Sequence, residues 1–413
     1  MTRTRRQRGT VYIAILGLSI LVAVIGLGGI ALSRAQGRAR DLQADTDEAR
    51  GYAMDAVELA RTLINADANW RTDYSNGNWF TNQSWGNGSF TLNVTDPAGA
   101  LNNADTDPVT VTGTGMKGQA VQRIQVTLVP VLTPYSCMYA ALCTGGLLSL
   151  NNTTVIGAGA LISSNTSITT GNATVYPSAE SAGAVLGSTF YANVTSLATP
   201  RTLPPSNVFD YYNANGTTIA YSSLPSGGTL QNCLLSPTSN PYGATNAKGI
   251  YIINCNLQNL TINNCRIVGT LVILNANNIT IQGNINWEPA VANLPCLLMQ
   301  GSVTMKASNG TLNEGGSIPN LNPASTPYPY PNGAGNSTTS DSYPSVIDGL
   351  VYVSGNLVIQ NNPSVDNLLV TGTLNASGIL SLNPQPILLS NPPPGFRTVN
   401  MGVSPGTWKQ QVN

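Results

Sequence analysis

The first hydrophobic pattern along the chain is an apolar run from Val11 to Leu32 that contains no charged residue. As a helix rising about 1.5 Å per residue, this run would cross the roughly 30 Å hydrocarbon core of a membrane. It exceeds the apolar region of about 7–15 residues that is typical of a cleaved secretory signal. The pattern predicts a transmembrane helix over residues 10–33. The basic leader before it, residues 1–9, would remain in the cytoplasm because its arginines fix that end.

A second periodic pattern follows in residues 34–69. Between residues 41 and 66 there is no proline, and apolar or small residues recur every seven positions at Leu42, Ala49, Ala56 and Leu63. Such a stripe is typical of an amphipathic helix that packs along one side. We expect this helix to continue the transmembrane one. The alternative is two helices broken near Gly37.

Alternating apolar and polar residues replace the helical period in residues 70–135. Alternation with a period of two is typical of strands that have one buried face. It predicts a small module of three or four antiparallel strands that cover one side of the helix. The residues expected to face inward are Phe90, Leu92, Val94, Val109, Val111, Val121, Ile124, Val126 and Leu128.

From residue 136 to 395, short apolar pairs recur about every 8–11 residues, with Asn or Gly between them, as in "NLTINNCRIVGTLVILNANNITIQG". This spacing favours a right-handed parallel β-helix, a β-solenoid, over a β-sandwich. Asparagine suits the corners because it tolerates a left-handed backbone and can stack its amide on the next coil. Loop interruptions are expected near 200–245 and 308–345. Residues 396–413 are expected to form a C-terminal tail. The predicted fold class is therefore mainly β.

Composition excludes several kinds of function. Only 9% of residues are charged, with 18 basic against 18 acidic side chains, so nothing indicates a nucleic-acid partner. The chain contains no histidine, which removes the commonest general base and metal ligand. We expect no metal, no cofactor and no catalytic residue.

The six cysteines are even in number and form no CxxC pair. In an exported protein they could form disulfides. The local candidate pairs are Cys137 with Cys143 and Cys255 with Cys265. The alternative is that the cysteines act as small buried apolar residues.

The N-terminal features together resemble the type IV pilin and type II secretion pseudopilin family. They are the basic leader, Gly9 at its end, an apolar helix that begins at once, and an amphipathic continuation beside a small β-module. The resemblance implies cleavage of the leader between Gly9 and Thr10. It also implies that the N-terminal helix contacts other pilin or pseudopilin subunits and the membrane.

Ala14 departs from the family pattern. Counted from Thr10 it is the fifth residue, where family members usually carry glutamate. Subunits at a filament tip, and some minor pilins, lack that carboxylate. Ala14 therefore indicates a specialised or tip position, and it also leaves open an uncut anchor.

These patterns predict a structural minor pilin or pseudopilin-like subunit in a bacterial inner membrane, with its bulk in the periplasm or outside the cell. One alternative is a membrane-displayed adhesin that binds a surface glycan. A less favoured alternative is a polysaccharide-processing enzyme. The acidic residues of the β-solenoid are scattered singly along the sequence, but contact between adjacent coils could bring Asp348 and Asp366 together. Two carboxylates within about 10 Å of each other in a groove would favour the enzyme. A groove lined by Tyr and Asn would favour adhesion.

Overall fold

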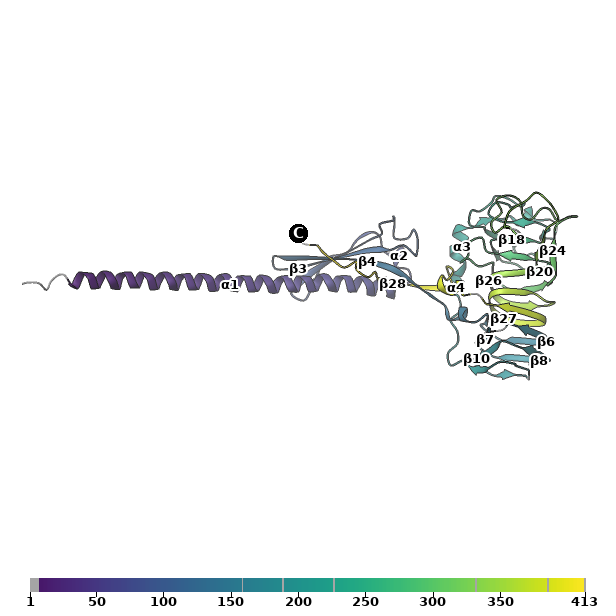
Figure 1. Ribbon diagram of the computed structural model, residues 1–413, viewed down its shortest axis with the longest axis horizontal. Coiled ribbons are helices and arrows are strands. Elements are labelled where there is room, and N and C mark those ends of the chain that lie inside the picture. Colours follow the sequence, from purple (N-terminus) through teal and green to yellow (C-terminus); the bar gives the residue numbers. More distant parts are fainter. Residues whose placement is uncertain are drawn as a thin grey trace, which may run out of the picture. The chain divides into compact units, whose positions relative to one another are not determined.

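The structure is a computed structural model that describes residues 7–157, 159–187, 189–225, 227–330, 333–384 and 386–411, with side chains from Val11 onward. The chain is mainly β and has one long helix (Figure 1). It divides into two compact units. The first contains the described residues up to Val131 and those from Val399, and the second contains Leu132–Thr398. Residues 1–6 of the expected leader lie outside the described residues, and residues 7–9 already belong to the helix.

Helix α1 (Gln7–Ala66) is continuous over 60 residues. No proline interrupts it, and Gly37, the alternative break point, is helical. Its large apolar side chains between Val11 and Leu32 are exposed, and the helix is long and apolar enough to cross a membrane. Its C-terminal part is buried along one side, and the buried residues there are Ala49, Ala53, Ala56, Val57, Ala60 and Ile64. The prediction of one unbroken helix is confirmed.

The first unit also contains an antiparallel sheet. Its strands are β1 (Gly77–Trp85), β2 (Gly88–Thr95), β3 (Val109–Lys117), β4 (Ala120–Pro134), β28 (Arg397–Val403) and β29 (Lys409–Gln411). The order is β1-β2-β3-β4-β28, and β29 also pairs with β4. A short helix, α2 (Trp70–Asp73), links α1 to β1.

The inner face of this sheet packs on α1. Eight of the nine residues expected to face inward are buried, but Val121 is 40% exposed. Val121 and Ile124 are three residues apart on β4, so they fall on opposite faces of a strand whose side chains alternate. On β3, a Cβ atom added to Gly113 or Gly115 would overlap a backbone carbonyl of α1. Glycine therefore lets the helix approach the sheet closely.

The last residues belong to this first unit and do not form a separate tail. Strand β28 lies next to β4, and Asn65 of α1 holds its backbone at Met401. The Asn65 Nδ2 donates to the Met401 carbonyl at 3.2 Å, and the Met401 N–H donates to Asn65 Oδ1 at 2.7 Å. The expected tail over 396–413 was wrong in this respect, because no local pattern indicates that β28 pairs with a strand more than 260 positions earlier.

The second unit is a parallel β-helix. Its strands are β5 (Leu142–Thr144), β6 (Leu148–Ile156), β7 (Leu161–Ser164), β8 (Ile168–Gly171), β9 (Thr174–Val175), β10 (Ser178–Ser181), β11 (Val185–Leu186), β12 (Val194–Ser196), β13 (Thr217–Thr218), β14 (Thr229–Gln231), β15 (Leu234–Leu235), β16 (Ile250–Asn254), β17 (Leu260–Asn263), β18 (Arg266–Val268), β19 (Thr270–Leu274), β20 (Ile279–Gly283), β21 (Asn286–Glu288), β22 (Leu297–Met299), β23 (Val303–Ala307), β26 (Val346–Ile359) and β27 (Ser364–Asn383). Apolar side chains stack inward in register, for example Ile253 on Ile273 on Met299. All three are fully buried.

The path of the chain through the stack is not sequential. The first strands, β5 and β6, pair with the last, β27. From that junction the stack runs through β7 and β10 to β12 in one direction. In the other direction it runs through β26, β22, β19 and β16 to β13. The chain therefore enters and leaves this unit at the middle of its stack (Figure 1).

The two expected loop interruptions are partly structured. Residues 200–245 contain the short helices η2 (Ser206–Phe209), α3 (Asp210–Asn215) and η3 (Tyr221–Ser223), together with the complete coil β13–β15. Residues 308–345 contain the antiparallel pair β24 (Thr311–Asn313) and β25 (Ser342–Pro344). Two further short helices, η1 (Ser136–Tyr139) and α4 (Ile387–Ser390), lie near the two ends of the unit's sequence.

The corners of the coils are rich in asparagine with a left-handed backbone. Examples are Asn232, Asn256, Asn264 and Asn275, with φ between 49° and 51°. Side-chain amides also bond from one coil to the next, as from Asn275 Nδ2 to Asn254 Oδ1 at 3.3 Å. The predicted role of asparagine at the corners is confirmed.

Candidate functional site

The N-terminal residues singled out in the sequence all lie on α1. Gly9 and Thr10 are helical, and the side chain of Thr10 is outside the described set. Ala14 is exposed within the apolar segment. An exposed surface of this length and apolarity matches a lipid environment or the helices of other subunits. Cleavage after Gly9 stays a prediction.

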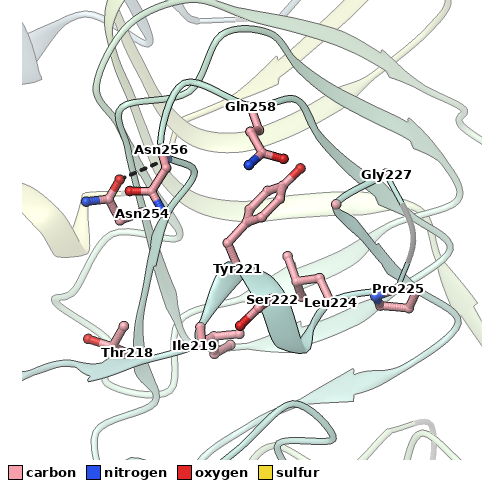
Figure 2. A pocket seen from close by; sticks show the side chains of 12 residues that line it. Thr218, Ile219, Tyr221, Ser222, Leu224, Pro225, Gly227, Asn254, Asn256 and Gln258 are labelled. Atoms are coloured by element: carbon pink, nitrogen blue, oxygen red, sulfur yellow. Dashed lines mark hydrogen bonds between the residues drawn. The ribbon is translucent and has the colours of Figure 1, made fainter.

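A pocket of about 660 Å³ lies on the solenoid between two successive corners (Figure 2). One wall is formed by residues 218–225, 227 and 228, which lie between β13 and β14 and include η3. The other wall is the corner after β16, with Asn254, Asn256 and Gln258. Thr218 and Ser222 add hydroxyl groups, and none of the described residues that line the pocket carries a charge.

Tyr221 stands in the middle of this pocket, between the amides of Asn256 and Gln258 and the loop that carries Pro225 and Gly227 (Figure 2). Its hydroxyl donates to the Asn259 carbonyl at 2.5 Å and so ties one corner to the other. Gly228 lies against the ring at φ 64°, and a Cβ there would overlap the tyrosine hydroxyl. The ring is therefore fixed by its surroundings.

The second pocket of interest, of about 230 Å³, is acidic. It is lined by Glu288, Asp348 and Asn367, among others. Asp348 pairs in register with Asp366 on the next coil. The two carboxylates are thus neighbours across strands that lie about 4.8 Å apart. The sequence left open that adjacent coils bring Asp348 and Asp366 together, and the structure places them on paired strands.

The carboxylates at this second pocket already have protein partners. Glu288 Oε1 accepts a hydrogen bond from Arg266 Nη2 at 3.0 Å, and Asp348 Oδ1 accepts one from Asn367 Nδ2 at 2.8 Å. Partial burial raises the pKa of Glu288, and the Arg266 guanidinium opposes this effect. Partial burial also raises the pKa of Asp348, and the charge of Asp366 adds to it. Among the described residues, no group of three acidic or cysteine side chains could hold a metal ion.

All six cysteines are buried thiols. The structure has no bridge between Cys137 and Cys143, or between Cys255 and Cys265. Cys265 instead lies beside Cys233, with 3.6 Å between the sulfur atoms, because these residues stack on successive coils. Burial raises the pKa of Cys143 to about 12 and that of Cys255 to about 11, so both remain protonated at neutral pH.

Comparison with known proteins identifies no family for this chain. No family model matches the chain, and no curated protein matches it. Among solved structures, the competence-associated pilin ComZ from Thermus thermophilus aligns with 89% of this chain and 97% of its own, at 10% identity and a TM-score of 0.25. A similarity at this TM-score shows neither a shared fold nor a shared function, so a functional proposal has to rest on the chain's own residues.

Proposed function

We propose that this chain is a membrane-anchored, pilin-like subunit whose solenoid is presented outside the inner membrane. The observation that supports this role best is the difference in exposure between the two parts of α1. Its first part is apolar and exposed, and its second part is buried by an antiparallel sheet. An exposed apolar helix needs lipid or other apolar helices around it. The same helix can therefore serve as a membrane anchor and as the packing surface of a filament.

The proposed role within a filament or secretion machine is structural: initiating, capping or decorating it. Ala14 supports a specialised position. A glutamate at this position would need a positively charged partner within the bilayer, whereas alanine needs none. We propose no catalytic activity. The acidic pocket does hold two carboxylates, Glu288 and Asp348, but both are engaged by protein groups: Glu288 is paired with Arg266, and Asp348 accepts a hydrogen bond from Asn367.

Two measurements on cells that make the full chain test this role. Mass spectrometry of the mature protein should find an N-terminus at Thr10. A photo-cross-linking residue placed at Leu18 should capture other pilin-like subunits. The same residue placed at exposed Leu257 on the solenoid is the control and should not capture them.

The outcomes separate the alternatives. A chain that retains its leader and cross-links only to lipid from position 18 is a plain membrane anchor, and the pilin-like role would be wrong. Equal capture of pilin-like subunits from positions 18 and 257 would contradict packing through the N-terminal helix.

A further inference from the structure

The pocket around Tyr221 exists because successive corners of the solenoid differ in length. The corners at residues 275–278 and 255–259 are tight turns between strands. The corresponding corner of the next coil, residues 219–228, is longer and contains a short helix. The longer corner diverges from its neighbour, and the space between the two is the pocket.

The tight corner offers its polar groups to this space in a fixed geometry. Its backbone is bonded to the next coil, with Leu257 N–H donating to the Asn275 carbonyl at 2.6 Å and Asn277 N–H to the Gln258 carbonyl at 3.0 Å. The side-chain amides of Asn256 and Gln258 are exposed, and within the described ranges they have no protein hydrogen-bond partner. Each amide can therefore donate to and accept from a ligand.

Tyr221 supplies the complementary apolar surface. An aromatic face attracts C–H groups through its negative charge density, and it buries apolar area without losing much conformational freedom. The ring is already fixed by the bond of its hydroxyl to Asn259 and by contact with Gly228. Binding would therefore require little additional ordering.

The chemistry of this lining selects a class of ligand. An aromatic ring beside several amides and hydroxyls suits a molecule with C–H faces and many hydroxyl groups. The lining carries no charge, so an anion or a cation would find no opposite charge to offset its loss of hydration. The volume of about 660 Å³ is within the range of about 300–1,000 Å³ that is usual for ligand sites.

We propose that the pocket between residues 218–225 and 227–228 on one side and 254–258 on the other binds a neutral oligosaccharide. Tyr221 stacks on a sugar ring, and Asn256 and Gln258 bond its hydroxyl groups. This activity does not depend on how the chain is anchored, so it can fail while the pilin-like role stands, and the reverse also holds.

The test uses the full chain in detergent on an array of neutral oligosaccharides built from glucose, galactose, mannose or N-acetylglucosamine, beside sialylated and sulfated counterparts. Binding is expected on the neutral set. In calorimetry with the strongest neutral binder, Gln258→Ala should weaken affinity about tenfold, since it removes the hydrogen bonds of one amide. Tyr221→Leu should weaken it at least as much, while Tyr221→Phe, which keeps the ring, should retain binding.

Gln231→Ala is the matched control, because Gln231 is also an exposed glutamine of the solenoid but does not line the pocket. It should bind as the unchanged chain does. Three results would overturn the proposal: no binding to any neutral sugar at about 10 mM, binding only to the acidic sugars, or binding that neither Gln258→Ala nor Tyr221→Leu alters. Because the Gln258 side chain is exposed and makes no hydrogen bond within the described residues, its variant tests the site even if a Tyr221 variant fails to fold.

Discussion

Arg266 lies completely inside the solenoid unit, and its removal should loosen one defined segment. Its guanidinium donates to the carbonyls of Leu321 and Tyr328 at 2.9 and 2.6 Å and to Glu288 at 3.0 Å. It also donates to the side chains of Asn286 and Asn322 at 3.2 and 3.4 Å. Since Leu321, Asn322 and Tyr328 belong to the excursion between β23 and β26, this arginine fixes that excursion to the coil surface.

Arg266→Met keeps much of the volume of the side chain but removes every donor. Two carbonyls would lose a bond, at about 1–3 kcal/mol for each group left unsatisfied. Breaking a buried ion pair from one side typically loses about 3–5 kcal/mol. Because Glu288 is 28% exposed, water can replace part of its bond. We therefore expect the free energy of unfolding of the solenoid to fall by about 3–5 kcal/mol.

The assay combines urea unfolding of the full chain in detergent with limited proteolysis and hydrogen exchange. Exchange should accelerate first in residues 308–345, and proteases should cut there while the coils remain intact. Glu288→Gln is the control, because it removes the charge but keeps an acceptor for Arg266, and its loss should be smaller. A loss below about 1 kcal/mol with an uncut excursion would refute the reasoning, because five bonds from a buried cation cannot then be stabilising.

Three further predictions concern other parts of the chain. Gly115→Ala should destabilise the first unit by about 1–3 kcal/mol, because its Cβ would overlap α1. Gly51→Ala is the control and should not destabilise this unit, because a Cβ there would have nothing within 4 Å. Equal melting temperatures of the two variants would contradict the close approach of α1 to the sheet. Folding raises the pKa of Asp348, so stability falls as pH rises through that pKa. Asp348→Asn should therefore raise the melting temperature at pH 7, and the gain should disappear below about pH 4, where the unfolded carboxyl is also protonated. A gain that stays constant with pH would contradict a raised pKa at Asp348. Finally, a thiol reagent should modify none of the six buried cysteines before unfolding, because the folded chain shields their sulfur atoms; rapid labelling of the folded chain would count against the structure.

The sequence predicts those features that depend on neighbouring residues. The apolar run from Val11, the alternation through Leu92 and Val94, and the asparagine-rich corners all report local backbone geometry. Each was found where expected. The error at Val121 also has a local cause, since two positions three apart cannot share one face of a strand.

Features that depend on distant contacts could not be read in this way. The pairing of β27 with β5 and the return of β28 to β4 depend on which strands are adjacent in space. The proximity of Asp348 and Asp366 could be raised from the sequence as an option, but only the register of the coils decides it. The pocket is of the same kind, because the walls around Tyr221 and Gln258 face each other only when two corners of unequal length are stacked. A long, irregular corner that precedes the regular ones is the signal that could have indicated it.

The mid-stack attachment of the solenoid has a consequence for how the protein can evolve. Both connections to the first unit start at the junction of β27 with β5. The terminal strands β12 and β13 are therefore not joined to the first unit directly. Duplication of a coil at either end would extend the stack by about 4.8 Å and leave the attachment unchanged. The pocket corner, residues 219–228, belongs to one of these terminal coils. The number of coils, and the recognition proposed for this corner, could therefore change without altering the attachment.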